Sequence, residues 1–347
     1  MIVKSPLELH TIVVKILVAA GTAPKNASRV ADALVASNLC GVDTHGVFHL
    51  LSYIEQIKDG LLDAIASPKI LKESATTALI DGNWTFGHVV AKDALDVAIH
   101  KATENNIAIV GAVRSNHIGR VGEYVELAAE KGMCAIVCAS GFAETRPMAV
   151  PYGGREKAMH TNPIAIGFPG EDGSSMFLDF ATTAMSGSKA RLYKMRQHEL
   201  PIGTAVDEAG YSTTNPFLTD DGGSLLPFGG HKGYGIMAAV EFLGRSLTGS
   251  ANFREKGKGA TPMEEQGVTI IAFRADIHQP LSEFTRYAEA TSDKLRSVAP
   301  SPGFDEVMIP GDPEKNARLE RKANGIPIED EVWNSVLEAA RLAQTEI

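Results

Sequence analysis

The chain has 347 residues, enough for two or more lobes, because a single compact core usually stops growing near ~250–300 residues. Its 44% hydrophobic and 22% charged residues are ordinary for a globular protein, and a net charge of -9 without a basic arm disfavours a nucleic-acid partner. The apolar stretch at 11–20 contains Lys15 and is too short to cross a membrane. Cys40, Cys134 and Cys138 form no close pair, which fits a reducing compartment. We therefore expect a cytoplasmic protein that binds neither nucleic acid nor membrane.

The N-terminal region is predicted to be mainly helical. The run Ser5-Pro6-Leu7-Glu8 is a capping box with proline at the first helical position, and apolar residues at helical spacing follow it as far as Gly21. A second helix should begin near Pro24. The helical character continues to about residue 70.

From about residue 76 the pattern becomes β-α-β. Strands are expected at 78–80, 107–113, 133–139, 164–168, 176–179 and 268–273, with helices near 91–98, 121–128 and 232–247. After 310–313 the chain turns polar and helical again, and it ends in a helix from about residue 329. The fold class is therefore α/β. We expect residues 1–72 to pack with the C-terminal helices of 312–347, and residues 73–311 to form a central α/β lobe inserted between them.

The first motif that could carry chemistry is Asp43-Thr44-His45-Gly46. His45 and His49 are four residues apart and would share one side of a helix, with Tyr53 one turn further on. Histidine suits proton transfer near neutral pH, and Asp43 could orient or charge-stabilise His45. The same spacing would suit a zinc-dependent hydrolase, although no glutamate follows His45 as a general base. A catalytically silent binding protein is a third interpretation.

Two further motifs lie where strands end or helices begin. Ser115-Asn116-His117 follows the expected strand at 107–113, and ligand sites in open α/β sheets lie beyond strand carboxyl ends. The glycine-rich run 227–235 surrounds His231 and Lys232 at a helix start, where it could bind a phosphate or simply form a tight turn. No G-x-G-x-x-G follows a strand, so any dinucleotide site is not of the ordinary Rossmann type.

Together these motifs resemble the malate/L-lactate dehydrogenase family of the non-Rossmann type, from about residue 5 to 340. This family also includes ureidoglycolate, sulfolactate, diketogulonate and cyclic-imine carboxylate oxidoreductases. Besides the two histidine motifs, the resemblance is carried by Pro151-Tyr152-Gly153-Gly154, Thr161-Asn162-Pro163, Asp179-Phe180-Ala181-Thr182-Thr183, the run 229–235 and Pro310-Gly311-Asp312-Pro313.

The resemblance implies a homodimer with a distinctive α/β fold, and hydride transfer between NAD(P) and the carbon beside a carboxylate in a 2-hydroxy or 2-keto acid. His45 and His117 match the active-site histidines of the family, and one of them would be the proton donor. The residues that match dinucleotide-contacting stretches are Ser140, Thr161, Asn162, Pro163, Asp179, Phe180, Ala181, Thr182, Thr183, His231, Lys232, Gly311, Asp312 and Pro313. Asp312 could repel a 2′-phosphate, which favours NAD over NADP.

The chain departs from the family pattern where the substrate would be held. The family usually has arginine at the position of His49, and a neutral imidazole is a poor substitute for a guanidinium that grips a carboxylate through two hydrogen bonds. His160 stands where glycine is common, and with Tyr53 it joins the candidate substrate-binding residues. Arg120 or Arg146 could supply the missing charge. We therefore expect a substrate other than plain malate or lactate, and a cyclic imine carboxylate is the nearest alternative.

Overall fold

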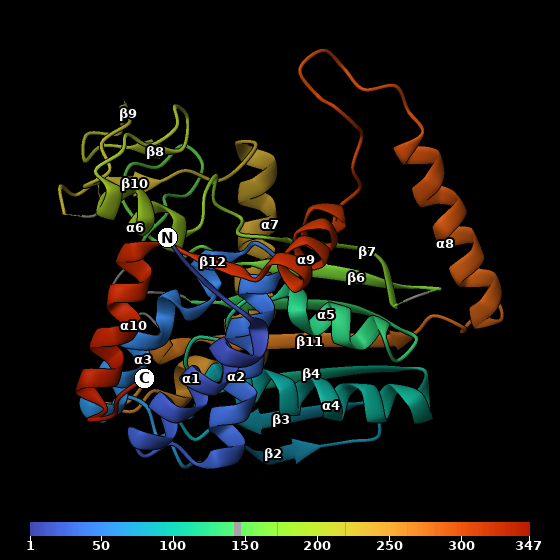
Figure 1. Ribbon diagram of the computed structural model, residues 1–347. Coiled ribbons are helices and arrows are strands. Elements are labelled where there is room, and N and C mark those ends of the chain that lie inside the picture. Colours follow the sequence, from blue (N-terminus) through green and yellow to red (C-terminus); the bar gives the residue numbers. More distant parts are fainter. Residues whose placement is uncertain (142–146, 172, 219, 262) are drawn as a thin grey trace.

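A seven-stranded mixed sheet forms the centre of the molecule (Figure 1). The computed structural model describes residues 1–141, 147–171, 173–218, 220–261 and 263–347. The sheet has the strand order β2-β3-β4-β11-β5-β6-β7, in which β3 and β4 are parallel and the other neighbours antiparallel. Its strands are β2 (Lys69–Glu73), β3 (Thr77–Asp81), β4 (Ile107–Val113), β5 (Met133–Ser140), β6 (Ile164–Gly170), β7 (Gly173–Phe180) and β11 (Gly267–Arg274). The α/β fold class is confirmed.

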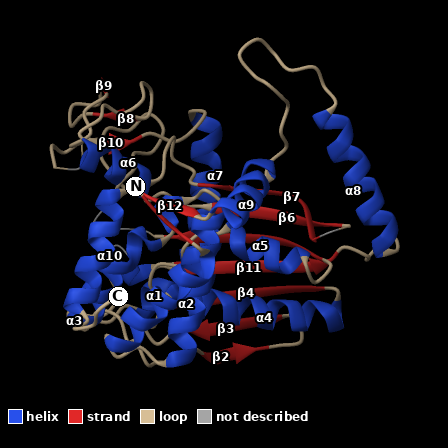
Figure 2. Cartoon of the chain, in the orientation of Figure 1, coloured by secondary structure: helices blue, strands red, loops and turns tan. Residues whose placement is uncertain are grey.

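The middle strands are apolar because they are covered by helices. Ile270 of β11 pairs with Val110 of β4 and Val137 of β5, and all three side chains are buried. Strands covered in this way consist of continuous apolar runs rather than alternating ones. The helices α4 (Gly87–Asn105) and α5 (Gly122–Ala129) pack on this sheet and share its hydrophobic core. Figure 2 shows the strands stacked through the molecule with helices around them.

The two ends of the chain share a second hydrophobic cluster. It joins α1 (Pro6–Ala19), α2 (Pro24–Leu39), α3 (Leu50–Lys58) and α10 (Asp330–Leu342). The capping box at Ser5 and Glu8 is formed, so the first helix begins where the sequence predicts. Strand β1 (Ile2–Lys4) pairs with β12 (Ile326–Ile328), which ties the first residues to the C-terminal region.

A third hydrophobic cluster surrounds a small sheet of strand order β10-β8-β9. This part of the chain contains β8 (Ala205–Val206), β9 (Ser212–Thr213), β10 (Ser224–Leu225), α6 (Gly187–Arg196) and α7 (His231–Glu241). After α7 a π-helical turn, Phe242–Ser246, packs against β11 and β5. In Figure 1 α8 (Leu281–Arg296) projects to one side of the sheet, and α9 (Asp312–Asn324) returns the chain towards β12.

Several elements were not expected from the sequence. The strand β2 lies in the region predicted to be helical, and the expected boundary at residue 72 falls inside it. Neither α6 nor α8 was predicted. Helix α6 buries only Ala190 and lacks an apolar stripe. Helix α8 buries only Thr285 and Ser292, and the helical spacing of Leu281, Phe284, Ala288 and Leu295 was missed. Among the described residues, no helix combines the length and apolar character needed to cross a membrane.

Candidate active site

A cleft of about 1370 Å³ opens at one edge of the central sheet. At this edge β3, β4, β5 and β7 end while β6 and β11 begin, as the register of Val268 with Ala112 and of Gly267 with Ser140 shows. Loops that follow strand ends therefore converge here, as is usual for ligand sites in α/β proteins. The cleft is lined by residues from the N-terminal region, the sheet edge and α6.

The segment that carries His45 and His49 forms two 3₁₀ turns, Asp43–His45 and Val47–His49, rather than the predicted helical turn. The break occurs at Gly46, where the Asn38 side chain crosses so closely that a Cβ would lie 2.2 Å from its Oδ1. Asn38 accepts a hydrogen bond from the Val47 N–H at 3.0 Å and thereby fixes the second turn. Both histidines still line the cleft, with ring centroids 6.1 Å apart.

Asp43 does not act on His45 as expected. Its carboxylate accepts hydrogen bonds from Arg321 of α9 at 2.7 and 3.0 Å and from Asn38 at 2.6 Å. The ring of His45 instead has Thr44 Oγ1 3.2 Å from its Nδ1. Asp43 therefore fastens the turn to α2 and α9, and the hydroxyl of Thr44 orients the imidazole.

His117 is held at the end of β4 by buried hydrogen bonds. The neighbouring Asn116 donates to the carbonyl of Trp84 at 2.7 Å and accepts from the Ala260 N–H at 2.8 Å. The hydroxyl of Tyr53 lies 2.7 Å from His117 Nδ1. Burial raises the pKa of Tyr53 well above 10, so this phenol keeps its proton at neutral pH, and its oxygen can accept a hydrogen bond from the Nδ1–H of His117.

The rings of three other histidines surround that of His117, and all four imidazoles are held neutral. The ring centroid of His117 lies 5.8 Å from that of His45, 4.4 Å from that of His49 and 6.0 Å from that of His88. Burial is the main cause that lowers the pKa of His117 to about 3 and that of His45 to about 4. The positive charges of Arg191, for His117, and Arg120, for His45, add to this effect, and a proton on His117 would also be repelled by one on His45 or His160.

The remaining predicted substrate-binding residues have different surroundings. His49 and His160 line the cleft, where the nearest hydroxyls are Ser188 Oγ, 3.4 Å from His49 Nε2, and Thr161 Oγ1, 3.2 Å from His160 Nδ1. Burial lowers the pKa of His160 to about 4. Arg120 also lines the cleft, but it is buried and ion-paired with Glu126. Arg146 lies outside the described residues.

Comparisons with known proteins identify the family of the chain. The family described as malate/L-lactate dehydrogenase matches residues 5–337. The chain belongs to this family. It is 35% identical to the L-sulfolactate dehydrogenase of Methanocaldococcus jannaschii over 94% of this chain and 93% of that protein. Its fold matches malate dehydrogenase of Entamoeba histolytica with a TM-score of 0.91 and 26% identity, over 100% and 99% of the two chains. It also matches the Δ1-piperideine-2-carboxylate reductase of Pseudomonas syringae, with a TM-score of 0.84 and 27% identity over 98% and 100% of the chains.

The dinucleotide-contacting stretches expected from the malate/L-lactate dehydrogenase family only partly reach the cleft. The residues that line it are Thr161, Pro163, Asp179, Phe180, Ala181 and Thr183. Two buried residues support this loop from behind: Asn162 donates to the Met237 carbonyl at 3.1 Å, and Thr182 donates to the carbonyls of Thr161 and Asn162, each at 3.0 Å. Burial raises the pKa of Asp179 to about 6, although its carboxylate accepts the Gly122 N–H at 2.7 Å.

Six other predicted cofactor residues do not line the cleft. Ser140 is completely buried against Gly244, and its hydroxyl has no hydrogen-bond partner among the described residues. His231 and Lys232 are exposed at the start of α7. Gly311, Asp312 and Pro313 begin α9, where the Asp312 carboxylate accepts hydrogen bonds from Arg296 at 2.8 and 2.9 Å. The charge of Asp312 is therefore balanced, which removes the argument that it repels a 2′-phosphate.

The alternative zinc site lacks a complete ligand set in the described part of the chain. No three or more histidine, cysteine, aspartate or glutamate side chains are grouped there so that they could hold a metal ion. The rings of His45 and His49 are tilted by 56°.

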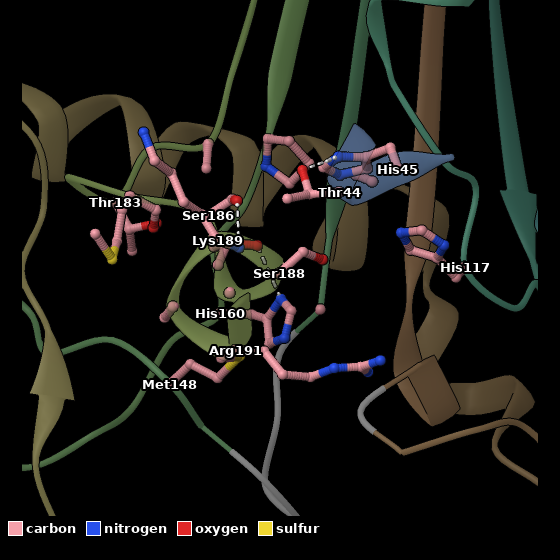
Figure 3. A pocket seen from close by; sticks show the side chains of 18 of the residues that line it. Thr44, His45, His117, Met148, His160, Thr183, Ser186, Ser188, Lys189 and Arg191 are labelled. Carbon is pink, nitrogen blue, oxygen red and sulfur yellow. Dashed lines mark hydrogen bonds between the residues drawn. The ribbon is translucent and has the colours of Figure 1, made fainter. Parts of the chain in front are cut away.

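Sequence reasoning missed the contribution of α6 to the cleft. Ser188, Lys189 and Arg191 all come from α6 and line the cleft (Figure 3). They carry no motif, and α6 itself has no apolar periodicity that would have predicted it. His88 was missed as well, because it stands alone in the first turn of α4, yet it packs against Tyr53 and His117.

Proposed function

We propose that this protein is an NAD(P)-dependent oxidoreductase that transfers hydride between nicotinamide and the carbon bearing the hydroxyl of a 2-hydroxy acid, or the ketone of the matching 2-oxo acid. The observation that carries the proposal is the position of His117. It is bonded to Tyr53, lies beside His45 and His49, and faces a cleft that the dinucleotide-contacting stretches also line.

His117 is proposed as the proton donor and acceptor. When Nδ1–H donates to the Tyr53 oxygen, Nε2 carries the lone pair, and it has no hydrogen-bond partner among the described residues, so it is free to face the substrate oxygen. In oxidation the neutral imidazole takes the hydroxyl proton while the substrate carbon loses hydride. In reduction the imidazolium returns that proton to the ketone oxygen. A placed acid of this kind typically contributes 10²–10⁴-fold to the rate. His45 is the alternative donor.

The cleft fits a nicotinamide dinucleotide, which would supply or accept the hydride. Its volume of about 1370 Å³ exceeds the ~300–1,000 Å³ of most ligand pockets and leaves room for cofactor and substrate together. The first turn of α6 also lines the cleft, and its backbone N–H groups and Lys189 suit a pyrophosphate. We propose NAD or NADP as the cofactor without a preference, because the pairing of Asp312 with Arg296 removes the sequence argument for NAD.

The substrate class has one close alternative. A relative of the same fold is a Δ1-piperideine-2-carboxylate reductase, and a cyclic imine carboxylate also needs hydride at the carbon beside a carboxylate. The replacement of the family arginine by His49 favours a substrate other than malate or lactate.

We further propose a homodimer. Phe242 and Leu247, 69% and 59% exposed on and beside the π-helical turn, are candidates for burial in its interface. Light scattering would measure the oligomeric state.

The test is NADH and NADPH consumption with pyruvate, oxaloacetate, 3-sulfopyruvate and Δ1-piperideine-2-carboxylate. We expect turnover with at least one of them, and we expect His117→Asn to lower its kcat by roughly 10²–10⁴-fold. His45→Asn is the matched variant, and it should lower kcat less. A larger loss in His45→Asn would assign proton transfer to His45. No consumption with any of the four compounds would contradict the proposed function.

A further inference from the structure

The turn that carries His45 and His49 has no lysine or arginine that could bind the substrate carboxylate. The proposed reaction requires an anionic group to be held beside His117, and His49 occupies the position where the family resemblance implies an arginine. Guanidinium is the side chain best suited to this task, because its fork of N–H groups matches the two oxygens of a carboxylate. Another lysine or arginine that lines the cleft must therefore bind the substrate carboxylate.

Arg120 is poorly placed for this role. Its guanidinium is ion-paired with Glu126, which also pairs with Arg318. The carboxylate of Asp179 lies close enough to raise the pKa of Arg120 further, so an approaching anion would meet a second negative group. Lys194 on α6 is similarly ion-paired, with Asp220 at 2.6 Å. Both side chains already have their counter-ions.

Arg191 differs from them in having no carboxylate within ion-pair distance in the described part of the chain. The acidic group whose charge acts on it is Glu55, from beyond that distance. Its guanidinium carbon lies 4.4 Å from the centre of the Phe48 ring. Stacking on an aromatic face keeps a guanidinium flat and leaves its edge N–H groups free to donate.

Arg191 also faces the reacting histidines. Figure 3 shows its side chain extending from α6 past His160, with the guanidinium on the side of the cleft that holds His117. Its positive charge helps to lower the pKa of both His49 and His117, which agrees with the position of its guanidinium over Phe48, the neighbour of His49. A carboxylate bound to Arg191 would therefore lie next to the group that transfers the proton, as the carboxylate of a 2-oxo acid must.

We propose that Arg191 binds the carboxylate of the substrate and takes the place of the arginine that this chain lacks at position 49. This inference rests on the proposed function for the identity of the substrate, a 2-oxo or 2-hydroxy acid or a cyclic imine carboxylate. Phe48 is the platform that positions the guanidinium. The charge has moved from the turn that carries the histidines to α6, which packs against that turn at Phe48 and His49.

The test compares Arg191→Met and Arg191→Lys with Arg196→Met. Arg196 is on the same helix and pairs with Glu329, but it does not line the cleft. Each variant is assayed with the best acid of the substrate panel and with the methyl ester of its carboxylate beside the reacting carbon. We expect Arg191→Met to lower kcat/KM for the acid by roughly 10- to 100-fold, as for loss of a hydrogen bond to a charged group, and to change that for the ester by less than about threefold. Arg191→Lys should fall between wild type and Arg191→Met, and Arg196→Met should match wild type.

A second measurement separates this inference from the proposed function. Oxamate, a non-reacting carboxylate, is titrated into the wild type and the variants by calorimetry in the presence of NADH. Arg191→Met should weaken oxamate binding by the same factor as it lowers kcat/KM for the acid. Should no acid be turned over while oxamate binding still depends on Arg191, the proposed activity fails and the anion site stands. An equal loss for acid and ester, or oxamate binding that is absent from the wild type or unchanged in Arg191→Met, would overturn the role of Arg191.

Discussion

At the scale of single residues, burial of the histidines from solvent sets their protonation state and therefore the chemistry of the site. His117 is bonded to the Tyr53 hydroxyl and surrounded by the rings of His45, His49 and His88. Burial disfavours the charged imidazolium, and the neighbouring positive charges disfavour it further. In the free protein His117 is therefore a base ready for oxidation, and its protonated form is scarce at neutral pH.

This state predicts different pH profiles for the two directions of the reaction. The pKa of His117 in the free protein is lowered to about 3, and kcat/KM reports the free enzyme. For reduction, the imidazolium fraction falls tenfold with each pH unit above that pKa, so kcat/KM should fall about tenfold per unit from roughly pH 5 to 8. For oxidation, which uses the neutral imidazole, kcat/KM should stay flat over the same range.

Steady-state rates in both directions in a constant-ionic-strength buffer check this prediction. If kcat/KM for oxidation instead rises between about pH 6 and 7.5, His117 titrates near the ordinary histidine pKa of ~6.5, and its ring is accessible to water rather than buried.

At the scale of elements, the turn that carries His45 and His49 owes its shape to residues from α2 and α9. Asn38 crosses over Gly46 and bonds both to Asp43 and to the Val47 N–H. Arg321 of α9 holds the Asp43 carboxylate from the other side. The two 3₁₀ turns are thus defined by contacts with residues distant in sequence. Position 46 tolerates no side chain, because Asn38 occupies the space where a Cβ would lie.

A methyl group at position 46 should therefore disturb this turn. In Gly46→Ala the new Cβ would meet Asn38 Oδ1 at 2.2 Å, so the Asn38 side chain and its two hydrogen bonds must shift. We expect the free energy of unfolding to fall by roughly 1–3 kcal/mol, as for overpacking of a filled site. Urea unfolding monitored by circular dichroism measures this.

The matched variant is Gly235→Ala. Gly235 lies inside α7, and a Cβ there meets nothing within 4 Å. Alanine favours a helix over glycine by ~0.8–1 kcal/mol, so this variant should be as stable as the wild type or slightly more so. Equal urea midpoints for the two variants would show that Asn38 does not restrict position 46.

At the scale of the whole molecule, three hydrophobic clusters are visible. One belongs to the central sheet with α4 and α5, one to the two chain ends, and one to the small sheet with α6 and α7. We propose that residues 1–72 and 312–347 fold as one unit, which their shared cluster and the β1–β12 pairing support. Because the cleft draws residues from all three parts, its histidines are shielded from water only when the parts are assembled.

That shielding predicts an acid-sensitive fold. The folded pKa values of His45 and His160 are lowered to about 4 from an unfolded value near ~6.5, so the unfolded chain binds more protons between these limits. Stability should therefore fall as the pH falls from about 6.5 to 4, by ~1.4 kcal/mol per pH unit for each such histidine. Asp179, whose folded pKa is raised to about 6, offsets one of them over part of this range.

The variant His160→Gln isolates one contribution. It removes one titrating group while keeping a polar side chain of similar size. We expect the dependence of the free energy of unfolding on pH to become shallower by roughly 1.4 kcal/mol per unit between about pH 4.5 and 6. Urea titrations at several pH values give this slope directly, and an unchanged slope would mean that His160 is not buried as a neutral ring.

The sequence by itself determined the family, the α/β class and most elements of the central sheet and the first helices. These follow from local signals: the Ser5–Glu8 capping box, the buried apolar runs of β4 and β5, and motifs that lie within a few residues of one another. His45, His49 and His117 were identified for the same reason. The strands β1, β2 and β12 and the helix α6 were not, because short or weakly buried elements have no periodicity that points to a core. Helix α8 was missed although its apolar residues recur at helical spacing.

Only the tertiary structure decided which charges are available in the cleft. The guanidinium of Arg120 and the carboxylates of Asp43 and Asp312 all looked free in the sequence, yet each has a partner that another element supplies. Arg191 carries no motif in the sequence and lies in a helix that the sequence did not predict, yet the fold brings it over Phe48, 143 residues earlier in the chain. Pairing of charges depends on distances of a few ångströms between distant segments, and these distances exist only once the chain has folded.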